Sequence, residues 1–139
     1  MNISDIVQRA HENAVKHGFW DPAPEFGTAI ALIHSELSEA LEERRAGRPD
    51  LYFPCNAGGV CVDDIEDPGL TCGSRVTDPE HPGTCSAKSK KPEGVAVELA
   101  DAVIRIADLC GHLGIDLEAA IAMKMDYNET RPFKHGKRF

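Results

Sequence analysis

The segment from residue 95 to 109 is apolar around almost its whole circumference if it folds as a helix. Polar side chains interrupt it along one line only. These are Glu98, Asp101, Arg105, Asp108 and, just beyond the segment, His112, and their spacings of 3, 4, 3 and 4 residues place them on one narrow stripe. A helix with this pattern is expected to be buried on most sides. The sequence therefore predicts a bundle in which other helices cover this one.

Three further segments have the apolar periodicity of amphipathic helices, and no long segment alternates as a strand would. We expect a single all-α domain over residues 1–139, built as a four-helix bundle, with at most a short hairpin between Tyr52–Phe53 and Val60–Val62. The predicted helices run from Ser4 to His17 with Asn2 or Ser4 as cap, from Pro24–Glu25 to Ala46–Gly47, from after Pro92 to Gly111 or Gly114, and from the N-cap Asp116 to before Pro132.

A long irregular insertion is expected between the second and third helices, over residues 47–94. It holds 7 of the 12 glycines, 6 of the 9 prolines and four of the five cysteines. A stretch of this length without regular structure is uncommon in a compact domain unless it is disordered or functional, as a lid or a partner-binding lobe is. The fifth cysteine, Cys110, lies on the apolar part of the third helix and is expected in the core.

The four insertion cysteines leave three chemistries open: free thiols, zinc ligands and disulfides. The gaps between them are 5, 10 and 12 residues, whereas a zinc site usually has at least one pair separated by two to four. Free thiols are therefore favoured, and a structural Zn²⁺ is possible but unfavoured, with His81 able to replace one ligand. The candidate ligands are Cys55, Cys61, Cys72 and Cys85.

The net charge of -8 excludes several classes of partner. A general nucleic-acid binder needs a basic face that neutralises phosphates, and a polybasic membrane-surface protein needs one that meets anionic lipid. No apolar run is long enough for a membrane span, and residues 1–5 lack a secretory pattern. We therefore expect no nucleic acid and no membrane as partners, and a cytoplasmic location, which would be the host cytoplasm for a viral protein.

Two carboxylate pairs at helical spacing are the strongest chemical signal. Glu36 and Glu39 lie on the second predicted helix, and Glu98 and Asp101 lie on the third. Each i,i+3 pair shares one helix face, and like charges there repel unless a cation or solvent separates them. If the two helices pack antiparallel, four carboxylates form an oxygen-rich site suited to Mg²⁺ or Mn²⁺. A di-iron bundle is disfavoured because neither pair is a Glu-x-x-His motif.

The C-terminal segment has the opposite charge. Residues 124–139 carry five Lys or Arg and two Asp or Glu, a net of +3. Lys124, Asn128 and Arg131 lie on one face of the fourth predicted helix, and such side chains are good donors to phosphate oxygens. The alternative is an ordinary basic helix end. Together with an acidic metal site, this face suggests a ligand that brings both polyphosphate and a bound cation, as a nucleoside triphosphate does.

These residues resemble the MazG-like nucleotide pyrophosphohydrolases. The segment from Leu32 to Glu42 is similar to the family's second helix, that from Gly94 to Ile106 to its third, and that from Lys124 to Phe139 to its C-terminal part. The resemblance covers about half of the chain. The family pattern often has two adjacent glutamates where this chain has Ser35 and Glu36, and its connection between the second and third helices is much shorter.

The resemblance implies an all-α fold that assembles as a homodimer or homotetramer. It implies Mg²⁺-dependent cleavage of a (deoxy)nucleoside triphosphate into monophosphate and pyrophosphate. Glu36, Glu39, Glu98 and Asp101 would be the metal ligands, and Lys124, Asn128 and Arg131 the substrate contacts. We assign Glu39 as the general base, and Trp20 as a wall that stacks on the nucleobase. For Trp20 the alternative is a structural anchor in the core or at an interface.

Two alternatives to this activity stay open. One is an enzyme of a related kind, a phosphoribosyl-ATP pyrophosphohydrolase or an all-α deoxyuridine triphosphatase, which share similar helices and acidic motifs. The other is a helical oligomer without catalytic activity that binds a partner through the cysteine-rich lobe. A related enzyme would still release pyrophosphate in a metal-dependent reaction, whereas the non-catalytic oligomer would turn over no nucleotide.

Overall fold

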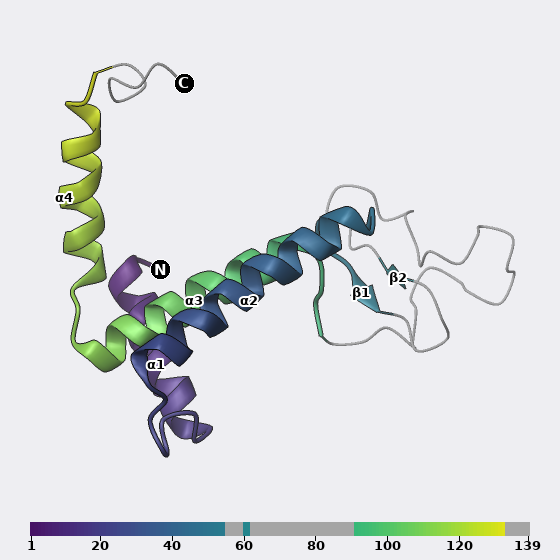
Figure 1. The fold of residues 1–139 in the computed structure, drawn as a ribbon, viewed down its shortest axis with the longest axis horizontal. Helices are drawn as coiled ribbons and strands as arrows, with labels where there is room; N and C mark the ends of the chain where they lie inside the picture. Colours follow the sequence, from purple (N-terminus) through teal and green to yellow (C-terminus); the bar gives the residue numbers. More distant parts are fainter. Residues whose placement is uncertain (55–59, 62–90, 133–139) are drawn as a thin grey trace, which may run out of the picture. The chain divides into compact units, whose positions relative to one another are not determined.

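The computed structural model describes residues 1–54, 60–61 and 91–132, and this part of the chain is mostly helical (Figure 1). The predicted all-α class is therefore confirmed. The elements are α1 (Ile3–Lys16), α2 (Phe26–Arg45), β1 (Phe53–Pro54), β2 (Val60–Cys61), α3 (Val95–Leu113) and α4 (Leu117–Glu129). The two strands pair antiparallel, as Phe53 with Cys61 and Pro54 with Val60, close to the predicted hairpin. No helix of the described residues combines the length and the apolar character that a membrane span requires.

The helix ends follow from local capping chemistry. Asn2 caps α1, since its side chain accepts a hydrogen bond from the Asp5 amide at 2.7 Å while its own amide donates to Asp5 Oδ2 at 3.0 Å. Asp116 caps α4 in the same way by accepting from the Ala119 amide at 2.9 Å. Gly114 follows α3 with a φ of +66°, a left-handed conformation that glycine adopts without steric cost.

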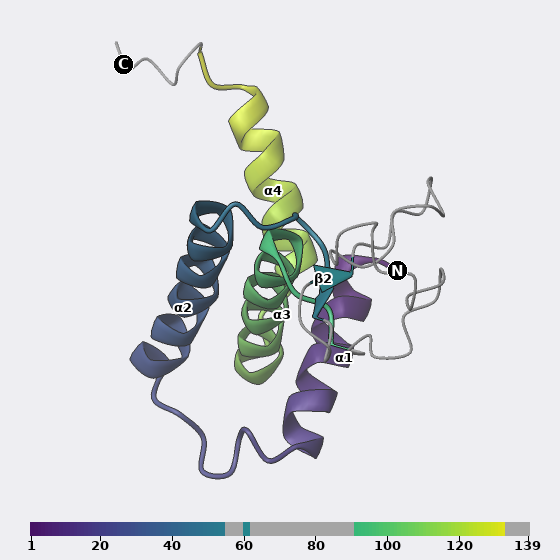
Figure 2. The ribbon, with the colours of Figure 1, turned by 90° about the vertical axis from the view of Figure 1, so that its right-hand side faces the viewer.

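The chain divides into two compact units. The first consists of Met1–Ala29 and Ile104–Phe139, and the second is Ile30–Val103. In the first unit α1 contacts the C-terminal half of α3, because Gly111 leaves room for the His11 side chain (Figure 2). α1 also contacts α4 through Ser4, whose amide and hydroxyl both donate to Glu118 Oε2, at 2.9 and 2.7 Å. The buried residues of this unit are Ala14, Ala107, Leu109 and Cys110.

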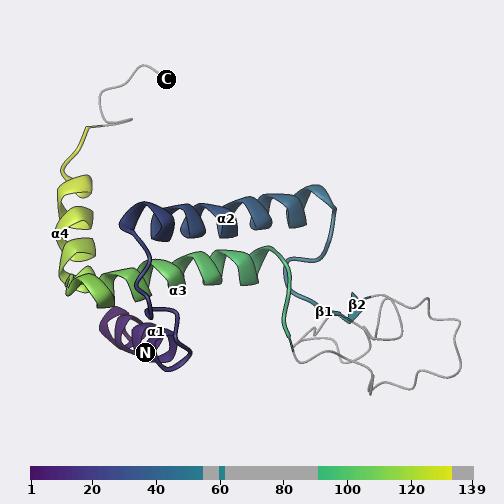
Figure 3. The same ribbon diagram turned by 60° about the horizontal axis from the view of Figure 1, so that its bottom comes forward.

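In the second unit, the greater part of α2 runs antiparallel beside the first half of α3 (Figure 1, Figure 3). Ala40 on α2 and Ala102 on α3 are both buried, as expected where two helices approach closely. The short strands lie near the start of α3 (Figure 3). Tyr52 forms an antiparallel bridge with Glu93 and so joins the chain before the strands to the chain before α3.

One expectation about α3 is wrong for the single chain. The pattern of residues 95–109 predicts a helix buried on most sides, yet Leu99, Val103, Ile104 and Ile106 are all exposed. An apolar circumference indicates helix surface that is costly to expose to water. It does not predict how much of that surface the other helices of the same chain cover. Within the described part of the second unit, α2 is the helix that packs beside α3, and it leaves Leu99 and Val103 exposed.

Candidate metal centre

Three of the four predicted carboxylates meet between α2 and α3 of the second unit. One oxygen each from Glu36, Glu98 and Asp101 lies within 4.8 Å of the others. The antiparallel packing brings Glu36 on α2 opposite the i,i+3 pair of α3, as the spacing predicts. Glu36 is only 6% exposed, and Glu98 and Asp101 are half-buried. The group is therefore partly withdrawn from water, unlike an ordinary acidic helix surface.

The electrostatics of Glu98 show how closely the four carboxylates are gathered. Burial raises the pKa of Glu98, and the negative charges of Glu39, Asp101 and Glu36 raise it further, while Lys91 lowers it. Glu39 is exposed and is not one of the three that converge, but its charge acts on Glu98 more strongly than either of the others. Glu39 therefore lies at the rim of the group, and the other three form its inner part.

The donor set fits a hard divalent cation. Every candidate ligand atom in the group is a carboxylate oxygen, the donor type that Mg²⁺ and Mn²⁺ prefer over imidazole and thiolate sites. The mutual repulsion that raises the pKa of Glu98 is the repulsion that a bound cation would remove. Glu36, Glu98 and Asp101 are the residues that could hold the ion.

The predicted phosphate contacts belong to the first unit. Lys124 and Asn128 lie on α4, and Arg131 follows that helix. The side chains of Lys124 and Arg131 both lie over the ring of Tyr127, with Lys124 Nζ at 4.9 Å and Arg131 Cζ at 5.9 Å from its centroid. Tyr127 therefore holds two cations together on one exposed surface. The sequence pattern predicted the basic face, but it did not predict that Lys124 and Arg131 would both lie over the ring of Tyr127.

Within the first unit, Trp20 packs against the C-terminal part of α3. Its Nε1 donates to Asp108 Oδ1 at 2.9 Å, and its ring stacks on His112 with centroids 3.8 Å apart and planes 10° from parallel. His11 Nδ1 lies 2.9 Å from the same Asp108 oxygen, and the His11 ring meets the Trp20 ring edge-on. These contacts match the anchor role for Trp20, and stacking on a nucleobase stays a prediction. His11 lies on the apolar face of α1 and had no signal in the sequence.

Most of the cysteine prediction lies outside the described residues. Cys55, Cys72 and Cys85, with His81, are not among them, and Cys61 is the last residue of β2. The zinc assignment therefore stays a prediction. Cys110 is a free, buried thiol on α3 whose pKa is raised by burial, which confirms it as a core residue.

Comparisons with known proteins leave the family open. No family model matches the chain, and neither curated proteins nor solved structures give a significant match. The MazG-like assignment therefore stays a prediction from the two acidic pairs and the C-terminal segment.

Proposed function

We propose that the chain is a Mg²⁺-dependent nucleoside triphosphate pyrophosphohydrolase of the MazG-like kind. The observation that supports this best is the convergence of Glu36, Glu98 and Asp101 within 4.8 Å, with Glu39 close enough to raise the pKa of Glu98. Carboxylates gathered in this way and partly shielded from water are suited to a divalent cation that accompanies a polyphosphate. We place the enzyme in the cytoplasm, of the host if the chain is viral.

The proposed reaction cleaves the bond between the α- and β-phosphates. A water oxygen forms a bond to the α-phosphorus, the bridging bond to the β-phosphate breaks, and pyrophosphate leaves with that bridging oxygen. Bound Mg²⁺ would supply positive charge that offsets the phosphate charge and makes the water more acidic. Glu39 accepts the proton of the water, because it is exposed and is not one of the three converging carboxylates.

The remaining proposed roles concern substrate binding. Lys124, Asn128 and Arg131 contact the phosphates, and Trp20 is the candidate wall for the base. The clustering of Lys124 and Arg131 around Tyr127 supports the first of these roles, because it holds two cations together on one surface. Trp20 donates to Asp108, and one face of its indole ring stacks on His112. A nucleobase would therefore stack on the opposite face of the indole.

A panel of ribo- and deoxynucleoside triphosphates, with Mg²⁺ or Mn²⁺, tests this function directly. The expected result is pyrophosphate and monophosphate in equal amounts for at least one substrate, abolished by EDTA. Release of orthophosphate alone would contradict the proposed cleavage site. Phosphoribosyl-ATP and deoxyuridine triphosphate belong in the panel because the related enzymes would prefer them, and turnover of no nucleotide would favour the partner-binding alternative.

We further propose that the enzyme assembles as a homodimer or homotetramer. Leu37 and Leu41 on α2, and Leu99 and Val103 on α3, are all exposed within the second unit. Apolar side chains gathered in this number on two neighbouring helices are typical of a surface that another protein covers. Because a second copy carries the same side chains, it offers an apolar surface of its own for this contact.

Light scattering on the purified chain tests the assembly. We expect a mass of two or four chains, falling to one for Val103→Lys, because a buried lysine would leave its charge without water or a partner. Val15→Lys is the matched control, since Val15 has the same 52% exposure as Val103 but lies on α1. A wild-type mass of one chain would contradict the proposal.

A further inference from the structure

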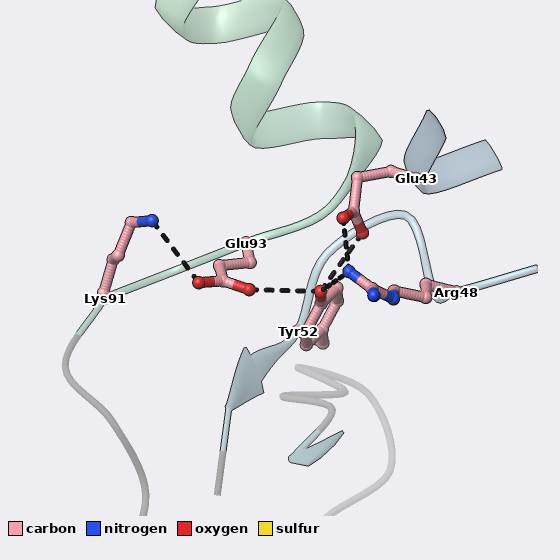
Figure 4. A network of polar contacts seen from close by, with 5 residues as sticks. All are labelled: Glu43, Arg48, Tyr52, Lys91 and Glu93. Atoms are coloured by element: carbon pink, nitrogen blue, oxygen red, sulfur yellow. Dashed lines mark hydrogen bonds and ion pairs between the residues drawn. The ribbon is translucent and has the colours of Figure 1, made fainter. Parts of the chain in front are cut away.

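The hydroxyl of Tyr52 is the centre of a polar network with Glu43, Arg48, Lys91 and Glu93 (Figure 4). Tyr52 is only 2% exposed. Arg48 Nη1 donates to its hydroxyl oxygen at 3.1 Å. The hydroxyl in turn lies 3.1 Å from Glu43 Oε2 and 3.2 Å from Glu93 Oε2, so two carboxylates share its single proton. Burial raises the pKa of Tyr52, which keeps that proton in place.

The charges around Tyr52 come in neutralised pairs. Arg48 Nη1 lies 2.6 Å from Glu43 Oε1, and Lys91 Nζ lies 3.3 Å from Glu93 Oε1. Each carboxylate that faces the hydroxyl therefore has its own cation. A neutral hydroxyl between two ion pairs joins them without adding charge, so the network stabilises one arrangement of three chain segments.

Two of those segments adjoin or belong to the helices that carry the converging carboxylates, α2 with Glu36 and α3 with Glu98 and Asp101. Glu43 lies on α2, two turns after Glu36, and Glu93 lies two residues before α3, five residues before Glu98 and eight before Asp101. Backbone hydrogen bonds also join the segments that carry Tyr52 and Glu93. The amides of Tyr52 and Glu93 each donate to the other residue's carbonyl oxygen at 2.9 Å. The two helices pack side by side. The position of the end of α2 relative to the start of α3 therefore determines which side chains face each other along the helix pair.

The start of α3 is also fixed by close backbone contact. The Ala96 amide donates to the Asp50 carbonyl at 2.9 Å. Gly94 packs so closely that a Cβ there would lie 2.6 Å from the Asp50 carbonyl oxygen and 2.8 Å from that of Pro49. The first turn of α3 contains Glu98. It is therefore fixed against Pro49 and Asp50, which lie just before Tyr52 in the chain.

We infer that Tyr52 is a positioning residue for the carboxylate group: its hydroxyl ties the end of α2 to the start of α3 and so keeps Glu36 opposite Glu98 and Asp101. This inference rests on the proposed metal site. Tyr52 acts on the group through the ends of the two helices, because its hydroxyl donates to Glu43 near the end of α2 and to Glu93 just before α3. The role concerns the chain's own geometry and is separate from the identity of the substrate.

Mn²⁺ affinity, measured by counting free Mn²⁺ by electron paramagnetic resonance, tests this role without an activity assay. We expect Tyr52→Phe to weaken Mn²⁺ binding about tenfold, the scale on which supporting contacts affect metal sites. Ser4→Ala is the matched control, because it also removes a hydroxyl that donates to a carboxylate, that of Glu118, but in the first unit. It should stay within about twofold of the wild type.

A second variant separates positioning from a general loss of stability. Leu109→Ala removes a buried side chain of the first unit and should lower the melting temperature without weakening Mn²⁺ binding at 10 °C, where circular dichroism verifies that each variant is folded. If Tyr52→Phe binds Mn²⁺ as the wild type does, or if Leu109→Ala weakens binding equally, Tyr52 has no positioning role. If the wild type binds no Mn²⁺, the metal site and this inference both fail.

Discussion

Replacing Glu98 by Gln should lower the rate of pyrophosphate release at least about a hundredfold, since losing a ligand costs at least as much as losing a supporting contact. Gln keeps the size of Glu but replaces one acceptor oxygen with an amide donor and removes one negative charge from the converging group. The cation then loses both a ligand and much of its attraction to the site. The measurement is pyrophosphate release at saturating Mg²⁺, and excess Mn²⁺ should restore activity only in part.

The control for this substitution is Glu12→Gln. Glu12 is exposed on α1 and accepts a hydrogen bond from Gln8, so the variant makes the same chemical change outside the carboxylate group. We expect its rate within about twofold of the wild type. Equal rates for Glu98→Gln and the wild type would show that the converging carboxylates do not hold the catalytic metal.

The stability of Glu98→Gln should change in the opposite direction from its activity. Because the pKa of Glu98 is raised in the folded protein, its contribution to stability is full below the pKa of the unfolded chain and is lost as pH rises through the folded value. Gln cannot ionise, so without metal the variant should be the more stable protein at pH 7. The difference should shrink on acidification towards pH ~4, near the ordinary pKa of Glu. Urea unfolding in EDTA at several pH values measures it.

Replacing Gly94 by Ala should lower the free energy of unfolding by about 3 kcal/mol, through strain and overpacking together. Gly94 has a φ of +111°, which an L side chain rarely adopts, and its Cβ would lie 2.6 Å from the Asp50 carbonyl oxygen. That oxygen accepts the Ala96 amide, so it cannot move away without breaking a bond that holds α3. Chemical denaturation followed by circular dichroism measures the loss.

Two other glycines separate the causes of this loss. Gly114 also has a positive φ, +66°, but a Cβ there would meet nothing within 4 Å, so Gly114→Ala should cost only the backbone strain of about 1 kcal/mol. Gly27, on α2, has neither a positive φ nor a close neighbour, and Gly27→Ala should stabilise by up to about 1 kcal/mol. Equal losses for Gly94→Ala and Gly114→Ala would contradict the crowding at Gly94.

The parts of the fold that sequence predicts well are those with local causes. Asn2 and Asp116 cap helices because their side chains reach amides three residues away, and Gly114 ends α3 because of its own backbone freedom. The carboxylate pairs are equally local, because i,i+3 spacing already puts Glu98 and Asp101 on one face. Only the antiparallel packing of α2 against α3 had to be assumed.

The parts that the sequence hides depend on residues far apart in the chain. The sequence predicts Tyr52 as part of a short strand. No neighbouring residue predicts its contact with Glu93, 41 residues away. Asp108 was visible in the polar stripe of α3, but its partners His11 and Trp20 lie on other elements. The exposure of Val103 is hidden for the same reason, because burial depends on neighbours that one helix pattern does not specify.

The bridge between Tyr52 and Glu93 has a consequence for how this chain could vary or be engineered. It brings the ends of the intervening segment together, whatever that segment contains. Closing a chain of twice the length costs only about 0.6 kcal/mol more. Lobes of different size, or a foreign domain, could therefore be spliced between these two residues while the helices keep their pairing. The bridge makes this point of the fold a junction at which new binding properties can be acquired without rebuilding the helices.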